Sequence, residues 1–155
     1  MIAQKEALKV NRRVLTALVA LGLSQALPGF AGPIITEKEA ALPVAKGELK
    51  TRGISRGPGI KVVSPDPSAA VRGAFDIQVN FEPRGGNKID PNSVRIMYLR
   101  SPAVDLTPRL KNGITETGIL YSKAEVPQGE HTLRIVVKDI EGRESSSTMT
   151  INAQK

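Results

Sequence analysis

The chain has 155 residues, of which 40% are hydrophobic and 24% are charged, and its mean hydropathy is −0.15. This composition fits one globular domain with additional segments, and it excludes a chain that is membrane-embedded or disordered throughout. Only 3% of the residues are aromatic and Trp is absent, so stacking platforms for sugar rings or single-stranded bases are nearly unavailable.

Residues 1–31 have the pattern of a secretory signal peptide. Basic side chains precede the apolar run VLTALVALGL, which is too short to cross a bilayer, and a helix-breaking Pro-Gly pair follows it. We expect cleavage after Ala31 or after Ala26, because small residues stand at both positions. An uncleaved membrane anchor or an amphipathic helix is the alternative interpretation.

The signal peptide and the segment after it account for most of the positive charge. Lys and Arg outnumber Asp and Glu by 22 to 15 in the full chain, by 18 to 14 from residue 32, and by 13 to 11 from residue 58. Net charge therefore gives little support to nucleic-acid binding. The chain has no Cys, so it uses no disulfide and has no lipobox cysteine. We expect an exported protein, periplasmic or secreted, with no membrane span after cleavage.

Residues 32–57 lack sustained periodicity and mix Pro, Gly and charges of both signs, which predicts a flexible linker or arm. Within it, Lys50, Arg52 and Arg56 stand close together. They could bind an anionic envelope polymer such as lipopolysaccharide, or they could belong to a solvated tether.

Residues 58–155 have the pattern of an all-β domain. Pro108 and the pair Asn112-Gly113 predict a single helical turn, and no longer helical pattern is present. About seven short strands separated by Gly- and Pro-rich turns favour an antiparallel two-sheet sandwich, with a small barrel as the alternative. The expected strands lie within residues 60–65, 74–82, 93–101, 104–106, 118–126, 130–139 and 146–152.

A family resemblance supports this fold. The stretch PQGEHTLRIVVKDIEGRESSSTMTIN is similar to the last hairpin of bacterial immunoglobulin-like domains, and KIDPNSVRIMYL is similar to the stretch that leads into their third strand. The resemblance covers residues 58–153 and implies an immunoglobulin-like or fibronectin-III-like sandwich, present here in one copy. Such domains occur in adhesins, enzyme accessory modules and surface proteins, so the resemblance implies no particular function. The positions that carry the hairpin pattern are Gly129, His131, Leu133, Ile135, Val137, Asp139 and Gly142.

The only histidine, His131, follows a Pro-Gln-Gly turn and shares its parity with Leu133 and Ile135. We therefore expect its side chain to face the core and to brace the start of the strand through a hydrogen bond to a loop carbonyl. Catalysis would need a Ser or Thr nucleophile and an acid such as Asp139, but the chain has no Gly-x-Ser-x-Gly elbow. We expect no enzymatic activity.

Metal sites are also poorly supported. One His and no Cys cannot supply the usual zinc ligands, and a copper site of clustered His and Met would have only His131, Met97 and Met149. Calcium could use carboxylates in loops, but no Asp-x-Asp run gathers them, and each has a simpler structural role in its turn. We expect no cofactor and no metal. The carboxylates considered are Asp66, Asp90, Asp105 and Asp139.

The most prominent basic set of the domain surrounds the expected strand at 93–101 and the loop after it. With Met97 and Leu99 facing outward, the set would form a mixed apolar and cationic strip suited to a protein strand or an anionic glycan. In the alternative, residues 104–113 cover both apolar side chains. The basic residues are Arg95, Arg100, Arg109 and Lys111.

Taken together, these features predict a non-catalytic, exported binding or scaffolding module of the bacterial cell envelope. It would recognise another envelope protein or an anionic glycan, and no nucleic acid, through a sheet edge or inter-strand loops. The alternatives are a binder of anionic polymer through residues 50–56, and a metal-handling periplasmic protein or an unrecognised enzyme.

Overall fold

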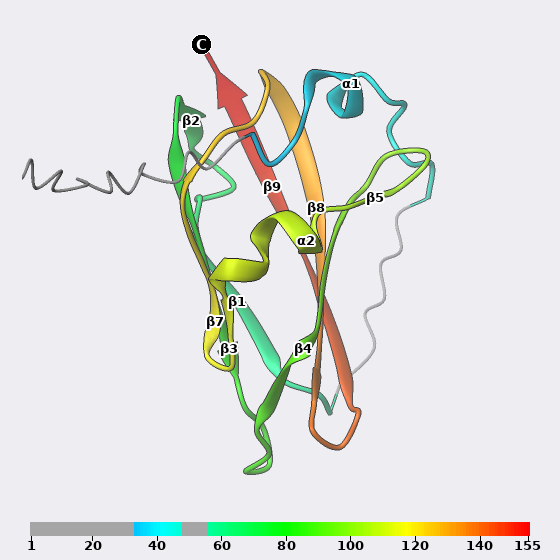
Figure 1. The fold of residues 1–155 in the computed structure, drawn as a ribbon, viewed down its shortest axis with the longest axis vertical. Helices are drawn as coiled ribbons and strands as arrows, with labels where there is room; N and C mark the ends of the chain where they lie inside the picture. The colour runs from blue at the N-terminus through cyan, green and yellow to red at the C-terminus, as the bar shows by residue number, and fades with distance from the viewer. Residues whose placement is uncertain (1–32, 48–55) are drawn as a thin grey trace, which may run out of the picture.

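A computed structural model describes residues 33–47 and 56–155. Two β-sheets face each other and enclose an apolar core, which confirms the expected all-β, two-sheet architecture (Figure 1). The predicted signal peptide lies outside the described residues. Within the described ranges, no helix has the length and apolar character needed to cross a membrane. The elements are α1 (Glu37–Ala40), β1 (Gly59–Ser64), β2 (Ala70–Arg72), β3 (Phe75–Glu82), β4 (Ile89–Tyr98), β5 (Val104–Asp105), α2 (Thr107–Leu110), the 3-10 turn η1 (Lys111–Gly113), β6 (Ile114–Thr115), β7 (Gly118–Ala124), β8 (Gly129–Asp139) and β9 (Glu144–Gln154).

The two sheets have the strand orders β1-β3-β7-β6 and β2-β9-β8-β4-β5. Neighbouring strands are antiparallel except for β2, which pairs with β9 in parallel and places Val71 opposite Ala153. The chain passes from the first sheet to the second between β1 and β2. In the strand order of the five-stranded sheet, the short strand β2 lies at one edge.

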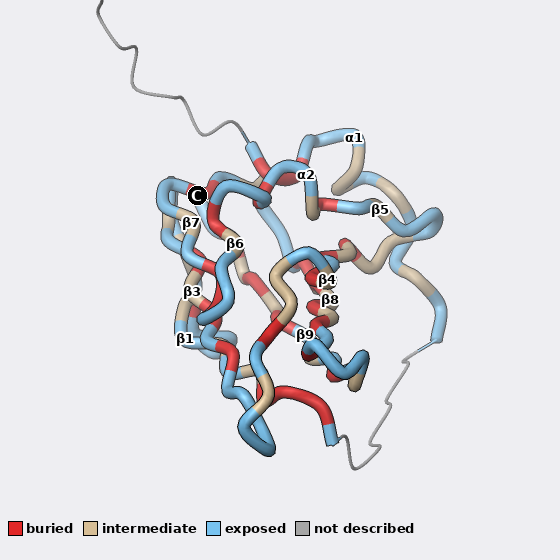
Figure 2. The backbone as a smooth tube through the Cα atoms, turned by 60° about the horizontal axis from the view of Figure 1, so that its bottom comes forward, coloured by how far each residue is buried: buried red, intermediate tan, exposed pale blue. Residues whose placement is uncertain are grey.

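Alternation of apolar and polar residues decides which face of each strand is buried. On β3, Ile77 and Val79 face the core and are each 1% exposed, whereas the preceding residue Asp76 faces away from the core and is exposed. On the opposing sheet, Tyr98 and Leu133 are fully buried, and buried positions lie between the sheets (Figure 2). Strand side chains point alternately to opposite faces, so each strand contributes one apolar row to the core.

Each of the seven expected runs contains a strand, but the described residues hold nine strands. The sequence did not indicate β2 and β6, which have three and two residues and show no visible alternation. β5 is equally short, and only the run at residues 104–106 indicated it. The single helical turn expected at Pro108 is present as α2 followed by η1.

Two predicted turn roles are confirmed. The Asp139 Oδ1 atom accepts hydrogen bonds from the backbone N–H groups of Glu141 (3.0 Å) and Arg143 (2.9 Å), and Gly142 has a φ of 82°. The Asp90 Oδ1 atom accepts a bond from the Asn92 N–H at 2.9 Å. Side-chain oxygens of this kind stabilise tight turns by replacing a missing backbone partner.

The segment at residues 33–47, which we call the N-terminal strap, differs from the flexible linker that the sequence predicted. Ile34 and Ile35 are 1% and 0% exposed and belong to the core. The Ile34 N–H donates to the Glu125 carbonyl at 3.0 Å, and Val44 forms an isolated β-bridge with Arg100. The packed domain therefore includes residues that lie before the expected boundary at residue 58. Burial of two adjacent isoleucines outweighs the weak local pattern that suggested a linker.

Candidate functional site

An open groove of about 740 Å³ lies where strand β2 and the end of β9 meet the loop between β7 and β8. This volume falls within the range of about 300–1,000 Å³ that is typical of ligand sites. We call it the end groove. Its lining residues are Glu37, Val71, Gly73, Glu125, Val126, Pro127, Gln128, Ala153, Gln154 and Lys155.

The end groove has apolar residues with charged groups around them. Val71 and Val126 are half-buried and pack against the core, and Ala153 of β9 is 9% exposed. Glu37 and Glu125 are exposed acidic residues of the same groove. The surface of the end groove is thus more polar than apolar, with an apolar part formed by Val71, Val126 and Ala153.

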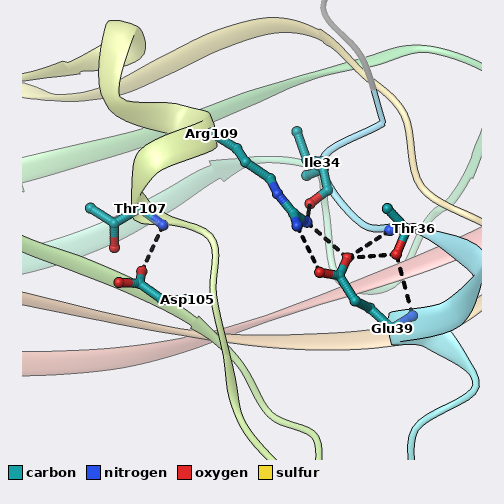
Figure 3. Close-up of polar contacts among 6 residues, drawn as sticks. All are labelled: Ile34, Thr36, Glu39, Asp105, Thr107 and Arg109. Atoms are coloured by element: carbon teal, nitrogen blue, oxygen red, sulfur yellow. Dashed lines mark hydrogen bonds and ion pairs between the residues drawn. The ribbon is translucent and has the colours of Figure 1, made fainter.

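The wall that carries Glu37 is fixed by contacts of the N-terminal strap. Helix α1 begins with a capping box, in which the Thr36 hydroxyl accepts from the Glu39 N–H at 3.3 Å and the Glu39 carboxylate accepts from the Thr36 N–H at 2.8 Å. Arg109 of α2 donates to both Glu39 carboxylate oxygens, at 2.8 and 2.6 Å, and to the Ile34 carbonyl at 2.8 Å (Figure 3). We call this arrangement the strap latch.

The charges of the strap latch perturb the ionisation of Glu39. Hydrogen bonds from the Arg109 guanidinium are the main cause that lowers the Glu39 pKa from 4.5 to about 2. A two-pronged bond between guanidinium and carboxylate is short and directional, so it holds the strap in a defined position.

The wall formed by the β7–β8 loop is fixed by His131. This histidine is 1% exposed, its Nε2 atom lies 2.7 Å from the Pro127 carbonyl, and its Nδ1 atom lies 2.8 Å from the Tyr98 hydroxyl. The Arg100 Nε–H donates to the same hydroxyl at 2.7 Å. The expected brace between His131 and a loop carbonyl is confirmed.

The partners of His131 define its tautomer. A carbonyl oxygen can only accept, so Nε2 carries the proton that bonds to Pro127, and Nδ1 of the neutral ring accepts from the Tyr98 hydroxyl. Burial is the main cause that lowers the pKa of His131 below 6.5, and the nearby charge of Arg100 acts in the same direction. With both ring nitrogens engaged inside the fold, this imidazole has no lone pair directed to a metal or a substrate proton.

The predicted basic strip is divided among separate contacts. Arg109 is held in the strap latch, and Arg100 donates to Tyr98 and to the Glu130 carbonyl. Arg95 donates to backbone carbonyls of its own strand, and Lys111 is exposed in η1. Arg100 and Arg109 thus serve internal contacts, so the four basic residues do not act as one uniform strip. A binding role for Arg95 and Lys111 stays a prediction.

The apolar part of that strip is half-buried. Met97 stands opposite Asp105 of β5 in the pairing of β4 with β5, and the Leu99 carbonyl accepts from the Ala45 N–H of the N-terminal strap at 3.4 Å. The expected excursion at residues 104–113 and the strap therefore both run beside this end of β4.

Of the basic residues predicted for the arm, Lys50 and Arg52 lie outside the described residues, and Arg56 is exposed at the edge of the described range. The carboxylates considered for calcium are engaged in turns, where Asp66 accepts from Ser68 and Asp105 accepts from the Thr107 N–H. Across residues 33–47 and 56–155, no three His, Cys, Asp or Glu side chains gather in a way that could hold a metal ion.

Sequence reasoning did not anticipate the roles of Glu39, Glu125 and Tyr98. The capping box around Thr36 and Glu39 was detectable, because a Thr followed three residues later by Glu is a helix-start signature. The contact of Glu39 with Arg109, 70 residues away, has no such local signal.

No protein-family model and no curated protein matches this chain. Among solved structures, the crystal structure of CopC from Methylosinus trichosporium OB3b is similar with a TM-score of 0.37 and 15% sequence identity. The likeness covers 63% of this chain and 97% of the CopC chain. At this identity and TM-score, it does not assign a function.

Proposed function

We propose that the chain is a non-catalytic binding module of the bacterial cell envelope that recognises a partner protein through the end groove. The observation that carries this proposal is the open groove itself, which combines half-buried apolar residues with exposed acidic residues beside the edge strand β2. Edge strands offer unpaired backbone groups, and protein segments are often recognised at such edges.

The walls of the end groove are held by contacts that do not depend on a partner. The strap latch fixes the α1 side, and the bond from His131 fixes the β7–β8 loop at Pro127. Recognition by a preformed surface avoids part of the entropic cost of ordering loops on binding. This arrangement supports a binding role for the groove.

We further propose that the sandwich is immunoglobulin-like. The order β1-β3-β7-β6 corresponds to the A-B-E-D sheet of such domains, and β9-β8-β4 corresponds to the G-F-C sheet. The hairpin formed by β8 and β9 spans the stretch that carries the family resemblance.

Site-specific photo-crosslinking tests the binding role. A photoreactive phenylalanine analogue would replace Gln128, an exposed residue of the end groove, in the full chain expressed in its own host. Glu116 provides the matched control, because it is also exposed but precedes β7, whereas the groove loop follows that strand. We expect discrete crosslinked products from position 128 and none of them from position 116. Identical products from both positions, or no product from position 128, would contradict the proposal.

The test uses the full chain because the N-terminal strap contributes to the core. A fragment beginning at residue 58 would lack Ile34 and Ile35 and would expose the apolar surface that they cover. Export is tested separately by N-terminal sequencing of the periplasmic and secreted fractions. We expect a start at Gly32 or Leu27, and an intact Met1 would contradict export by a cleaved signal peptide.

A further inference from the structure

We propose that the end groove accepts an extended segment of the partner protein that places a Lys or Arg side chain beside Glu37 and Glu125 and an apolar side chain on Val71 and Val126. This inference rests on the proposed binding function and names the chemistry of the partner. Four observations carry it.

The acidic residues of the groove differ from the other strap glutamate. Glu39 is paired with Arg109, whereas neither Glu37 nor Glu125 forms an ion pair with another described residue. Both are exposed and belong to one groove. A basic side chain entering there would meet two carboxylates that form no ion pair with a described cation.

The local charge also runs against the charge of the chain. Basic side chains outnumber acidic ones by 18 to 14 from residue 32 onward, yet the side of the groove formed by the strap and the β7–β8 loop presents two glutamates. A locally negative surface on a protein with net positive charge favours the binding of a cationic group at this place. Lys155, the residue after β9, adds a positive charge to the groove and disfavours a second basic group beside it.

The apolar part of the groove accounts for the second element of the segment. Val71 and Val126 are half-buried and pack against the core, so an apolar side chain that contacts them would be removed from water. Removal of apolar surface from water favours binding, so an apolar side chain of the segment would add to its affinity.

The edge strand accounts for the extended conformation. β2 lines the groove through Val71, and among the described strands it pairs with β9 alone. Beyond it, Gly73 has a φ of 67° and no atom lies within 4 Å of the position that a Cβ would occupy, so the backbone is approachable there. An extended segment alternates its side chains, which lets one face enter the groove while the other faces solvent.

Selection of displayed peptides tests the inference without knowledge of the partner. A phage-displayed library of random dodecapeptides would be selected for binding to the full chain. The affinities of the selected peptides would then be measured for the parent chain, for the variants Glu37→Gln and Glu125→Gln, and for the double variant. The control is Glu116→Gln, which neutralises an exposed carboxylate outside the groove. Circular dichroism would establish that each variant retains the thermal unfolding of the parent chain.

We expect the selected peptides to share a Lys or Arg next to Val, Ile or Leu. Loss of both groove carboxylates should weaken their binding about tenfold, which corresponds to two exposed ion pairs of about 0.7 kcal/mol each. The Glu116→Gln variant should bind like the parent. Peptides without a basic residue, or binding unchanged in the double variant, would overturn the inference.

The two proposals fail in different ways. If crosslinking at position 128 succeeds while the selected peptides show no preference for a basic residue, the partner chemistry is wrong and the binding role stands. If position 128 captures nothing and no peptide competes for the groove, both are wrong. If the basic residues Lys50, Arg52 and Arg56 of a second copy occupied the groove, the crosslinked products would contain this chain alone. That result would overturn recognition of a different protein.

Discussion

Replacement of His131 by Ala is expected to destabilise the fold strongly. The imidazole is 1% exposed, and it joins the Tyr98 hydroxyl to the Pro127 carbonyl through bonds of 2.8 and 2.7 Å. The substitution removes both bonds and leaves a space beside Tyr98, which is itself fully buried. It should therefore lower the free energy of unfolding and leave the chemistry of the groove carboxylates unchanged.

The magnitude follows from two contributions. The buried Tyr98 hydroxyl keeps the bond from Arg100 but loses the acceptor of its own proton, and a buried polar group that loses a partner costs about 1–3 kcal/mol. The cavity adds to this cost, so we expect a total of about 3–5 kcal/mol and a fall in melting temperature of roughly 10–20 °C. His131→Phe keeps most of the volume and loses only the polar contacts, so about 1–3 kcal/mol is expected for it.

Urea unfolding followed by far-ultraviolet circular dichroism measures these differences. The expected order of stability is parent, His131→Phe, then His131→Ala. A loss below about 0.5 kcal/mol in His131→Ala, the range of neutral surface substitutions, would refute the bracing role. Retained stability together with lost binding would instead identify His131 as a contact residue for the partner.

The pH dependence gives an independent check of the same histidine. Its pKa is below 6.5 in the folded chain, so below pH 6.5 the unfolded chain binds more protons than the folded chain. Stability should be complete above pH 6.5 and should decrease as the pH falls toward the lower folded pKa. Because the chain has one histidine, His131→Phe should abolish this dependence between about pH 7 and 5.5. A slope that persists in this variant would refute the assignment.

Three further substitutions test the strap and the sheets by thermal or urea unfolding. Ile35→Ala should cost about 2–5 kcal/mol because the side chain is fully buried, and a neutral effect would mean that the strap is not part of the core. Glu39→Gln should cost about 1 kcal/mol at neutral pH. The parent should lose this stabilisation as the pH falls from 4.5 toward 2, and the variant should lack that loss, since Glu39 has its pKa lowered to about 2. Gly118→Ala should cost more than about 3 kcal/mol, because a Cβ there would collide with the Val79 carbonyl of the adjacent strand, and near-parental stability would contradict the close strand contact.

Much of the fold could be predicted because its signals are local. Alternation along β3 and β8 identified the residues that face the core, and the same parity placed His131 inward beside Leu133. The turn of Asp139 and Gly142 was predictable for a similar reason, since its hydrogen bonds join residues two and four apart. In each case, the physical constraint acts within a few residues of the chain.

The strap latch and the end groove depend on contacts across the fold. Ile34 and Ile35 lie in a stretch without periodicity, and the strap is held in the core by distant contacts such as those of Ile34 with Arg109 and Glu125. Arg109 reads in sequence as a free surface cation, but the fold brings it to a carboxylate 70 residues earlier. The groove likewise joins α1, β2, the β7–β8 loop and the end of β9.

By itself, the sequence therefore determined seven of the nine described strands, their buried faces and the inward position of His131, because backbone geometry makes side chains alternate along a strand. Only the tertiary structure decided which arginines are engaged internally, that the strap belongs to the domain, and where two glutamates without an ion pair to any described residue line a groove together with apolar side chains. The physical reason is that these features depend on the positions at which distant segments converge when the two sheets pack, which no local pattern specifies.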